Sequence, residues 1–396
     1  MPFPEFIAPL TPVNVPVRRC PVPREDASER ILIMGLGALG DVVAQSPLLA
    51  ALRDAYPRSH LTWIVEHGNR GAVDASPLVD EVVSWDSGYW RHLLPTRWQK
   101  YLSLRRGLGL RGLWQAGRLR QELHRRRYDI YISLQPEEWA PLVRASGARV
   151  TVGVFPGITE RDHTAATRRY GHSFLAPDLP EHSTNRALTP LTALGTPLPA
   201  DKRLTMGYTQ EDAEAVERLL GQDGAAGRSP VVLAPMTTWA TKCWPAERYA
   251  ALGDRLARKG GRIVLIGSGQ EREAIEKVRS LMRESALALA GALTFRQMAA
   301  LLDRAALVVS GDTGPMHVAA AVGTPYVALF GPTPPRRYAP LVGPGRVLSH
   351  AVPCGPCNKM QCANMGAEEM LCLRLITVEE AYQSANLLLG NRGANL

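Results

Sequence analysis

Residues 306–333 read ALVVSGDTGPMHVAAAVGTPYVALFGPT, and this stretch decides the fold of the chain. The run 306–310 is apolar and β-branched, which is typical of a buried parallel strand. A Gly-Asp-Thr-Gly turn follows, and Pro315 then fits a helix start, because its missing N–H would be unpaired there anyway. An Ala-rich helix over 316–322 ends at a glycine, and 326–330 is a second strand. The pattern predicts a strand–turn–helix–strand unit whose helix N-terminus can bind a diphosphate.

The same stretch contains no charged residue from 313 to 335, so a purely structural core is an alternative interpretation. Its glycines and prolines interrupt it too often for a membrane-spanning helix. Asp312, Thr313 and His317 nevertheless gather at the helix start, and buried polar groups cost free energy unless they find partners. We therefore favour a ligand site at this helix start.

Two series of alternating strands and helices flank a Gly-rich linker at 221–229, which predicts two doubly wound α/β domains. The weakly patterned segment 157–200 precedes a helix at 210–220. The expected strands are 30–34, 61–66, 82–85, 129–134 and 150–154, then 231–234 and 262–267. The expected helices are 41–56, 140–146, 246–259, 270–283 and 294–303. We predict a Pro-rich tail at 1–28, a first Rossmann-like domain at 29–208, a second at 209–350 and a Cys-bearing tail and helix at 351–396.

The positive charge is concentrated in one segment. The net charge is +9, but residues 91–127 contain 11 Lys or Arg and one acid, so the remainder of the chain nets −1. Trp98, Trp114 and several leucines lie among these cations, which indicates basic amphipathic helices. We interpret the segment as binding an anionic membrane surface or an acidic acceptor, with a solvated face as the alternative. No recognised nucleic-acid motif is present, so we expect no nucleic-acid partner.

The six cysteines and the N-terminus bear on the compartment. The first residues lack a basic start followed by an apolar run, so we predict no secretory signal and a cytoplasmic location. Four of the cysteines have the spacing C-x2-C-x4-C-x9-C. This spacing permits a structural zinc site, although four reduced thiols packed on the core are the alternative. The four are Cys354, Cys357, Cys362 and Cys372.

A Gly-rich turn follows the first strand and has two interpretations. Gly35-x-Gly37-x-x-Gly40 matches a dinucleotide fingerprint, and Glu66 ends the next strand, so an NAD-dependent oxidoreductase is an alternative. However, Asp41 directly follows the third glycine and would place a carboxylate beside a pyrophosphate. We instead interpret the glycines as admitting a substrate close to the backbone, with Asp41 positioned to accept a proton from a hydroxyl.

A second polar loop follows the strand at 231–234. It contains Thr237, Thr238 and Lys242, and hydroxyls with a lysine in such a loop suit a phosphate. A surface loop with a solvated lysine is the alternative.

Three motifs in order resemble the glycosyltransferase family 9 heptosyltransferases, over about residues 30–385. They are Gly40-Asp41-Val42-Val43, Thr241-Lys242-Cys243-Trp244-Pro245 and the run Asp312-Thr313-Gly314-Pro315-Met316-His317. The resemblance implies a GT-B fold, with two Rossmann-like domains facing a central cleft, of which 29–208 would be the acceptor domain and 209–350 the nucleotide-sugar donor domain. It implies inverting transfer of heptose from ADP-heptose to lipopolysaccharide core or a related glycan, without an obligatory metal or cofactor. A non-catalytic sugar-nucleotide-binding protein remains a further alternative.

The resemblance also implies roles for individual residues. Asp41 would be the catalytic base, and Lys242 would stabilise the leaving nucleotide. The acceptor would be a lipid-linked or phosphorylated saccharide, which would place the enzyme at the inner face of the cytoplasmic membrane. The implied donor-site residues are Thr237, Thr238 and Lys242 for the phosphates, Glu271 for the ribose, Leu293 for the adenine, Asp312 for the sugar, and Thr313, Gly314 and His317 for the diphosphate. Gly37, Leu39 and Gly40 form the acceptor-side loop.

Overall fold

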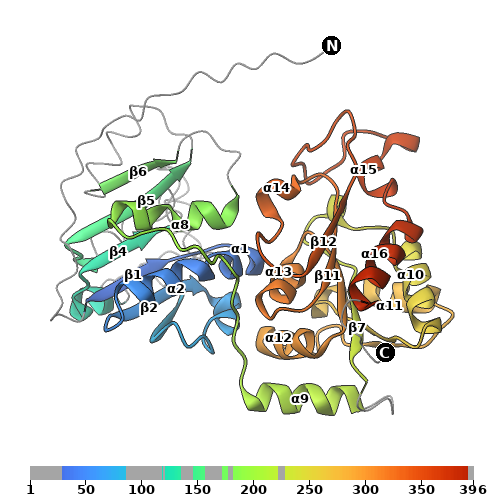
Figure 1. Ribbon diagram of the computed structural model, residues 1–396, viewed down its shortest axis with the longest axis horizontal. Helices are drawn as coiled ribbons and strands as arrows, with labels where there is room; N and C mark the ends of the chain where they lie inside the picture. Colours follow the sequence, from blue (N-terminus) through green and yellow to red (C-terminus); the bar gives the residue numbers. More distant parts are fainter. Residues whose placement is uncertain are drawn as a thin grey trace, which may run out of the picture.

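Two six-stranded parallel sheets, each flanked by helices, make up the protein (Figure 1). The computed structural model describes residues 29–85, 118, 121–134, 146–156, 172–176, 182–221 and 228–390. The predicted α/β class with two doubly wound domains is confirmed. The tail at 1–28 and most of the helix predicted at 140–146 lie outside the described residues.

The first sheet has the strand order β3-β2-β1-β4-β5-β6. This order reverses direction between β1 and β4, which is the place where ligands bind to doubly wound sheets. Its strands are β1 (Arg30–Met34), β2 (His60–Glu66), β3 (Glu81–Trp85), β4 (Ile130–Ser133), β5 (Val150–Pro156) and β6 (His172–Ala176). Its helices are α1 (Leu39–Ala44), α2 (Ser46–Ala55), the 3-10 helix η1 (His67–Ala72) and α8 (Ser183–Ala193).

The second sheet has the order β12-β11-β10-β7-β8-β9 and repeats the same topology, reversing between β7 and β10. Its strands are β7 (Pro230–Ala234), β8 (Arg262–Leu265), β9 (Ala286–Ala288), β10 (Leu307–Gly311), β11 (Tyr326–Phe330) and β12 (Gly345–Ser349). The helices in this half are η3 (Ala240–Lys242), α10 (Ala246–Arg258), η4 (Gly269–Glu271), α11 (Arg272–Leu281), α12 (Phe295–Arg304), α13 (Gly314–Ala321), α14 (Pro335–Tyr338), η5 (Gly366–Glu368), α15 (Leu371–Arg374) and α16 (Val378–Gly390).

The central strands read as continuous apolar runs because helices cover both faces of each sheet. Every residue of β7, β10 and β11 is buried. The C-terminal segment is fastened to this core by Trp244, whose indole N–H donates to the carbonyl of Ile376 at 3.0 Å. The same ring stacks edge-on against Tyr249, with centroids 5.1 Å apart. The chain after β12 is therefore part of the second domain.

Several sequence predictions about elements were wrong. The single helix expected from 41 to 56 is two helices, α1 and α2, separated at Gln45. Pro47 explains the break, because it lacks the N–H that a continuous helix would use and instead occupies the first turn of α2. The segment 157–200 contains β6 and α8, which no clear pattern had indicated. Strand β12 was missed because only its Leu348 is buried, so it lacks an apolar run.

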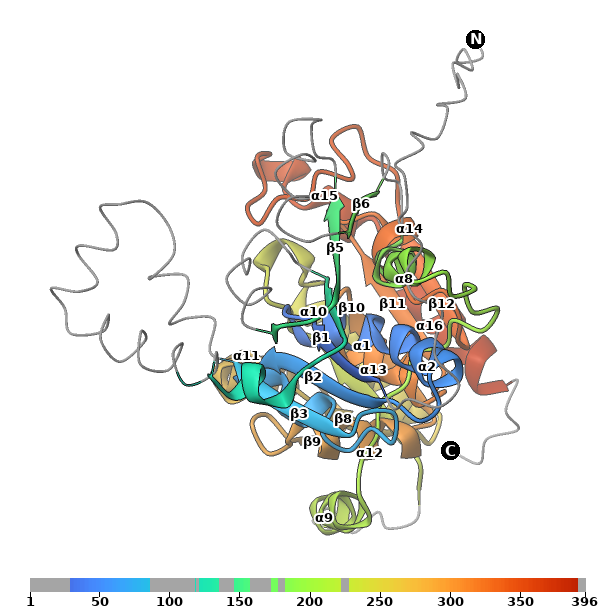
Figure 2. The same cartoon turned by 90° about the vertical axis from the view of Figure 1, so that its left-hand side faces the viewer.

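An extended segment leads from α8 to α9 (Gln210–Leu220), which packs along α12 of the second domain (Figure 2). Arg296 of α12 joins the two halves. Its guanidinium pairs with Asp212 of α9 at 2.9 Å and with Asp74 of the first domain at 3.2 Å. The exact domain boundaries stay predictions.

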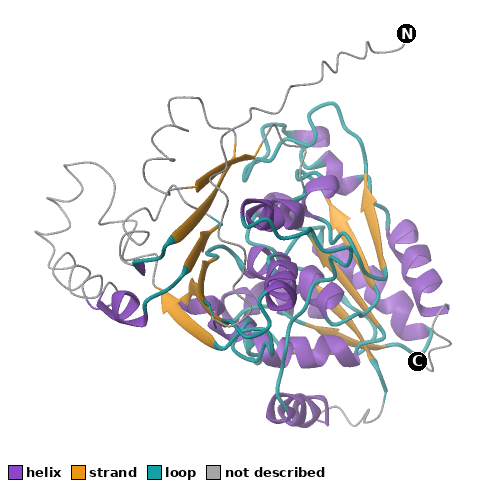
Figure 3. Cartoon of the chain, turned by 60° about the vertical axis from the view of Figure 1, so that its left-hand side comes forward, coloured by secondary structure: helices purple, strands orange, loops and turns teal. Residues whose placement is uncertain are grey.

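The domains also meet where α1 packs against α13 (Figure 1). Figure 3 shows helices, in purple, between the two groups of strands, in orange. A Cβ at Gly40 would lie 2.7 Å from Cδ2 of His317. A Cβ at Gly314 would lie equally close, 2.7 Å, to Cδ2 of Leu39. Glycine at both positions therefore lets the two helix starts approach, which puts the loop after β1 beside the loop after β10.

The basic segment 91–127 lies outside the described residues except for 118 and 121–127. In this described part, Leu123 is buried and Arg126 forms ion pairs with Glu81 at 2.6 Å and Glu122 at 2.5 Å. Arg125 and Arg127 are exposed. The charge of Arg126 is therefore engaged in ion pairs within the domain and does not contribute to a free basic surface. Within the described ranges, no helix is both long and apolar enough to span a membrane.

Gly40→Ala should push α1 away from α13. Alanine normally favours a helix over glycine, so any destabilisation reports the collision with His317. We expect a loss of about 1–3 kcal/mol in the free energy of unfolding, as for other overpacked interfaces, measured by denaturant titration. Gly68→Ala is the matched control, because a Cβ there meets nothing within 4 Å. Equal stability of the two variants would contradict the close approach.

Candidate active site

The strongest concentration of predicted site residues lies at the carboxyl edge of the second sheet. Two loops meet there, one running from β7 to η3 and the other from β10 into α13. Strands β7 and β10 are the neighbours at which the strand order reverses. Thr237 and Lys242, which share one loop, are thereby brought together with Asp312, which lies 70 residues after Lys242 in the sequence.

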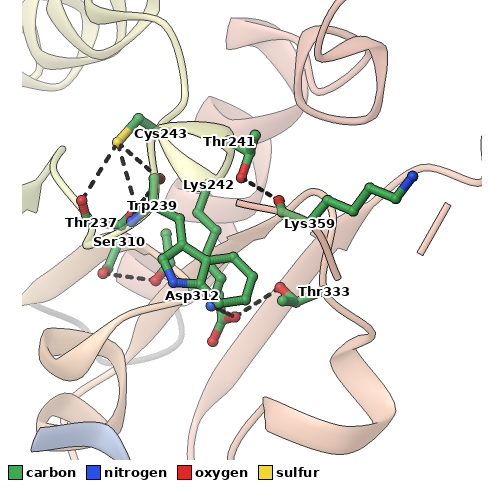
Figure 4. A network of polar contacts seen from close by, with 10 residues as sticks. Thr237, Trp239, Thr241, Lys242, Cys243, Ser310, Asp312, Thr333 and Lys359 are labelled. Atoms are coloured by element: carbon green, nitrogen blue, oxygen red, sulfur yellow. Dashed lines mark hydrogen bonds and ion pairs between the residues drawn. The ribbon is translucent and has the colours of Figure 1, made fainter. Parts of the chain in front are cut away.

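Lys242 and Asp312 form a buried ion pair (Figure 4). The ammonium lies 2.7 Å from Oδ2 of Asp312, and the side chains are only 14% and 6% exposed. The hydroxyl of Thr333 donates to the same carboxylate oxygen at 2.7 Å. Such a pair is costly to desolvate unless further hydrogen bonds complete it, and Thr333 provides one. Without a ligand, Asp312 is thus paired with Lys242 and hydrogen-bonded to Thr333.

Two aromatic rings flank the Lys242 ammonium. Its nitrogen lies 4.4 Å from the ring centroid of Trp239 and 5.8 Å from that of Tyr338 in α14. The sequence analysis missed both residues. Trp239 could have been noticed within its motif, but Tyr338 is distant in sequence and no pattern connects it to the lysine.

The loop that carries Lys242 is held by its own threonines. The hydroxyl of Thr237 donates to the carbonyl of Trp239 at 2.7 Å and accepts from its N–H at 3.3 Å. The hydroxyl of Thr241 donates to the carbonyl of Lys359 at 2.8 Å. Thr237 therefore orders the loop internally, while Thr238 is exposed and its implied phosphate role stays a prediction.

The N-terminus of α13 lies at the same edge of the sheet, directly after β10. Thr313 is the N-cap residue with an extended backbone, and its side chain makes no capping hydrogen bond. The positive end of the helix dipole at this helix start favours an anion. Gly314 allows the backbone of α13 to lie close to Leu39 of the first domain.

His317, in the first half of α13, is buried between the domains. Its Nδ1 has no hydrogen-bond partner among the described residues. Burial lowers the pKa of His317 to about 4, with the charges of His182 and Lys242 acting in the same direction and that of Asp312 opposing them. The imidazole is therefore neutral near pH 7.

Asp41 faces this site from the first domain. The surrounding protein desolvates its carboxylate and raises its pKa above the ordinary value, although one side of the residue is open to solvent. Hydrogen bonding from the Ala38 N–H, at 3.1 Å, opposes the shift. The charge of Asp312 raises the pKa of Asp41 further and that of Lys242 lowers it. The Asp41 carboxylate therefore interacts electrostatically with both groups across the domain contact.

The acceptor-side loop keeps this carboxylate in place through its glycines. Gly37 has a φ of +145°, and a Cβ there would lie 2.9 Å from Cβ of Asp41. Only glycine adopts this conformation without strain. Leu39 and Gly40 form the contact with α13 described above.

Glu271 and Leu293 follow β8 and β9, on the same edge of the second sheet. The Glu271 carboxylate accepts a hydrogen bond from the N–H of Ser268 at 2.7 Å. Leu293 is half-buried and packs on the core. Their implied roles toward ribose and adenine stay predictions.

The four clustered cysteines are free thiols on one segment. Across the described ranges, which include all four, no group of three His, Cys, Asp or Glu side chains has the arrangement of a metal site. The structural zinc stays a prediction without geometric support.

A second contact between the domains was not foreseen. His182, the N-cap of α8, accepts at Nδ1 from the N–H of Thr184 at 3.1 Å. Its Nε2 must therefore carry the proton and donate to the carbonyl of Ala339, directly after α14. The residue lies in the weakly patterned segment 157–200, where no motif marked it.

Comparisons with known proteins agree with this geometry. A family model described as glycosyltransferase family 9 (heptosyltransferase) matches residues 116–367. Lipopolysaccharide heptosyltransferase 1 of Pseudomonas aeruginosa is 30% identical over 351 residues, which cover 86% of this chain and 89% of the relative.

Solved structures share the fold. The family 9 glycosyl transferase of Veillonella parvula matches with a TM-score of 0.75 at 24% identity, over 92% of this chain and 97% of that one. The ADP-heptose lipopolysaccharide heptosyltransferase II of Escherichia coli matches with a TM-score of 0.70 at 20% identity, over 92% and 100%. The expected GT-B architecture is confirmed.

His317 should make stability depend on pH. Its pKa is lower in the folded protein, about 4, than the ordinary 6.5. The unfolded chain therefore binds this proton first, and stability is lost as pH falls from about 6.5 toward 4. His317→Asn should flatten that decline in the free energy of unfolding, measured by denaturant titration at several pH values. The exposed His67→Asn is the control, and an equal decline in both variants would contradict the prediction.

Proposed function

Since the chain belongs to glycosyltransferase family 9, we propose that it transfers a heptose from ADP-heptose to a hydroxyl of a lipopolysaccharide core saccharide. The observation that carries this proposal is the Asp41 carboxylate, which faces the ion pair of Lys242 and Asp312 across the contact between α1 and α13. A base in one domain then stands opposite an anion site in the other, which is the arrangement that a sugar transfer between two bound substrates requires.

The donor side has the groups that a departing nucleotide needs. The Lys242 ammonium and the N–H groups at the start of α13 both favour negative charge at one position. As the bond between the sugar and the diphosphate breaks, charge grows on the β-phosphate, and donors already in place stabilise it without reorganising. The names of the relatives, which include lipopolysaccharide heptosyltransferases and an ADP-heptose enzyme, support ADP-heptose as the donor.

The acceptor side has the base. The acceptor hydroxyl gives its proton to Asp41, and its oxygen attacks the anomeric carbon from the face opposite the diphosphate. The carbon–oxygen bond to the diphosphate breaks, ADP leaves with the electron pair, and the configuration inverts. A carboxylate whose pKa is raised is a better proton acceptor near neutral pH than an ordinary aspartate.

The alternatives predicted from sequence receive less support. For an oxidoreductase, the Gly-rich loop would have to admit a pyrophosphate, but Gly40 packs against His317 of the other domain. A non-catalytic binding protein would not need a carboxylate with a raised pKa in the facing domain, because such a group does not aid donor binding.

We place the reaction in the cytoplasm, at the inner face of the membrane. The acceptor is a lipid-linked or phosphorylated saccharide, and the cations of the basic segment 91–127 supply attraction to an anionic surface. This attraction does not depend on a spanning helix.

Asp41→Asn should lower turnover by about 10²–10⁴-fold, the usual contribution of a general base. The dissociation constant for ADP, measured by calorimetry, should stay unchanged because Lys242 and α13 remain. In the unsubstituted enzyme, kcat/KM should fall as pH decreases through the pKa of Asp41, which lies above 3.8.

Asp54→Asn is the matched control, because Asp54 is an exposed acid on α2 of the same domain. It should transfer heptose at the unsubstituted rate. Full activity of Asp41→Asn would refute the assignment of the base.

Binding to anionic liposomes should fall steeply as salt rises, because each basic residue near the surface contributes about 1 kcal/mol of screened attraction. Changing Arg105, Arg106, Arg125 and Arg127 to Gln should abolish sedimentation with these liposomes. Arg126 is left intact, since its ion pairs belong to the fold.

The control changes four exposed arginines elsewhere, Arg58, Arg218, Arg228 and Arg346, to Gln and removes the same charge. This control should still sediment. Equal loss of sedimentation in both variants, or liposome binding that does not depend on salt, would favour the alternative that the segment is a solvated face.

A further inference from the structure

The Lys242 ammonium of the candidate site lies beside two aromatic rings. Its nitrogen lies 4.4 Å from the Trp239 ring centroid and 5.8 Å from that of Tyr338, and Figure 4 shows the indole lying against the lysine side chain. Among the described residues, its one acidic ion-pair partner is Asp312, at 2.7 Å. The ammonium is thus shared between one carboxylate and two ring faces.

The two kinds of partner have different consequences for a bound diphosphate. A carboxylate neutralises the ammonium and uses one of its N–H donors. A ring face attracts the charge through its quadrupole, and this attraction grows when water is excluded. The ring takes up no N–H group and brings no negative charge to repel a phosphate. A ring beside Lys242 therefore holds the cation while leaving its charge and its other N–H donors for an anion.

The backbone of Trp239 is fixed independently of its side chain. Its N–H and carbonyl both bond the hydroxyl of Thr237, and its carbonyl also accepts from the N–H of Lys242 at 2.9 Å. Within the part of the chain that the structure describes, the indole N–H makes no hydrogen bond that orders the loop. Changing the ring should therefore alter the surroundings of the ammonium and leave the course of the loop intact.

We propose that Trp239 is a positioning residue for Lys242, holding the ammonium at the start of α13 so that it meets the diphosphate of a nucleotide sugar. Tyr338 closes a second side from a greater distance. The proposal rests on the proposed function for the identity of the donor. Without the indole, water and Asp312 become the main partners of the ammonium, and its interaction with the charge growing on the leaving group weakens.

The test is a double-mutant cycle on Trp239 and Lys242. Trp239→Leu should lower kcat for heptose transfer about tenfold and raise the dissociation constant for ADP less than that, since the charge on the leaving group is greatest in the transition state. Trp239→Phe keeps a ring face and should stay within about threefold of the unsubstituted enzyme. In a Lys242→Met background, Trp239→Leu should have no further effect on kcat or on ADP binding.

A matched control removes another ring from a cation in the same domain. Tyr382 lies 3.9 Å from the guanidinium of Arg255, away from the site. Tyr382→Leu should lower the melting temperature and leave kcat unchanged.

Two results would overturn the inference. One is a Trp239→Leu effect that persists in the Lys242→Met background, which would mean that the indole acts on the donor or on the loop itself. The other is a Trp239→Phe variant as impaired as Trp239→Leu. Binding of ADP and inorganic pyrophosphate separates this inference from the proposed function: if no heptose is transferred but the coupling appears in binding, the function fails and the positioning role stands.

Discussion

The site depends on the close approach of α1 and α13. Each helix has a glycine in its first turn at the point of contact, and a Cβ at Gly40 or at Gly314 would lie 2.7 Å from a side-chain atom of the other domain. Asp41 directly follows Gly40, and His317 is part of the contact itself. Separation of the helices would therefore remove the carboxylate from the anion site and expose the imidazole. The same few residues therefore form the contact between the domains and the candidate active site.

The electrostatic arrangement around the anion site is unfavourable in the free protein. Asp41 has a raised pKa and His317 a lowered one, both chiefly because the protein displaces water around them. A diphosphate between the helix start and Lys242 would supply the missing partner. Groups held at such a cost in stability are characteristic of functional sites, where selection retains them for the ligand. The buried pair of Lys242 and Asp312 follows the same logic, since Thr333 and the aromatic rings satisfy it only in part.

Much of the architecture could be predicted from local patterns. The apolar runs of β7, β10 and β11, and the Gly–Asp and Thr–Gly–Pro turns after β1 and β10, specify parallel strands that lead into helix starts. The pattern failed where its physical basis was absent. Strand β12 buries only Leu348, and the break between α1 and α2 depends on one proline inside an otherwise helical run.

The sequence by itself determined that Asp41, Lys242 and Asp312 each lie after a strand at the carboxyl edge of a sheet, because turn chemistry and apolar periodicity are local properties. Only the tertiary structure decided which loops meet. The order of the second sheet places Lys242 beside Asp312, and the paths of β11 and α14 bring Thr333 and Tyr338 to the same ammonium. The contact of His182 with Ala339 likewise joins segments that share no pattern. Sequence periodicity shows which face of an element is buried, but the partner across that face is set by how sheets order their strands and how domains pack.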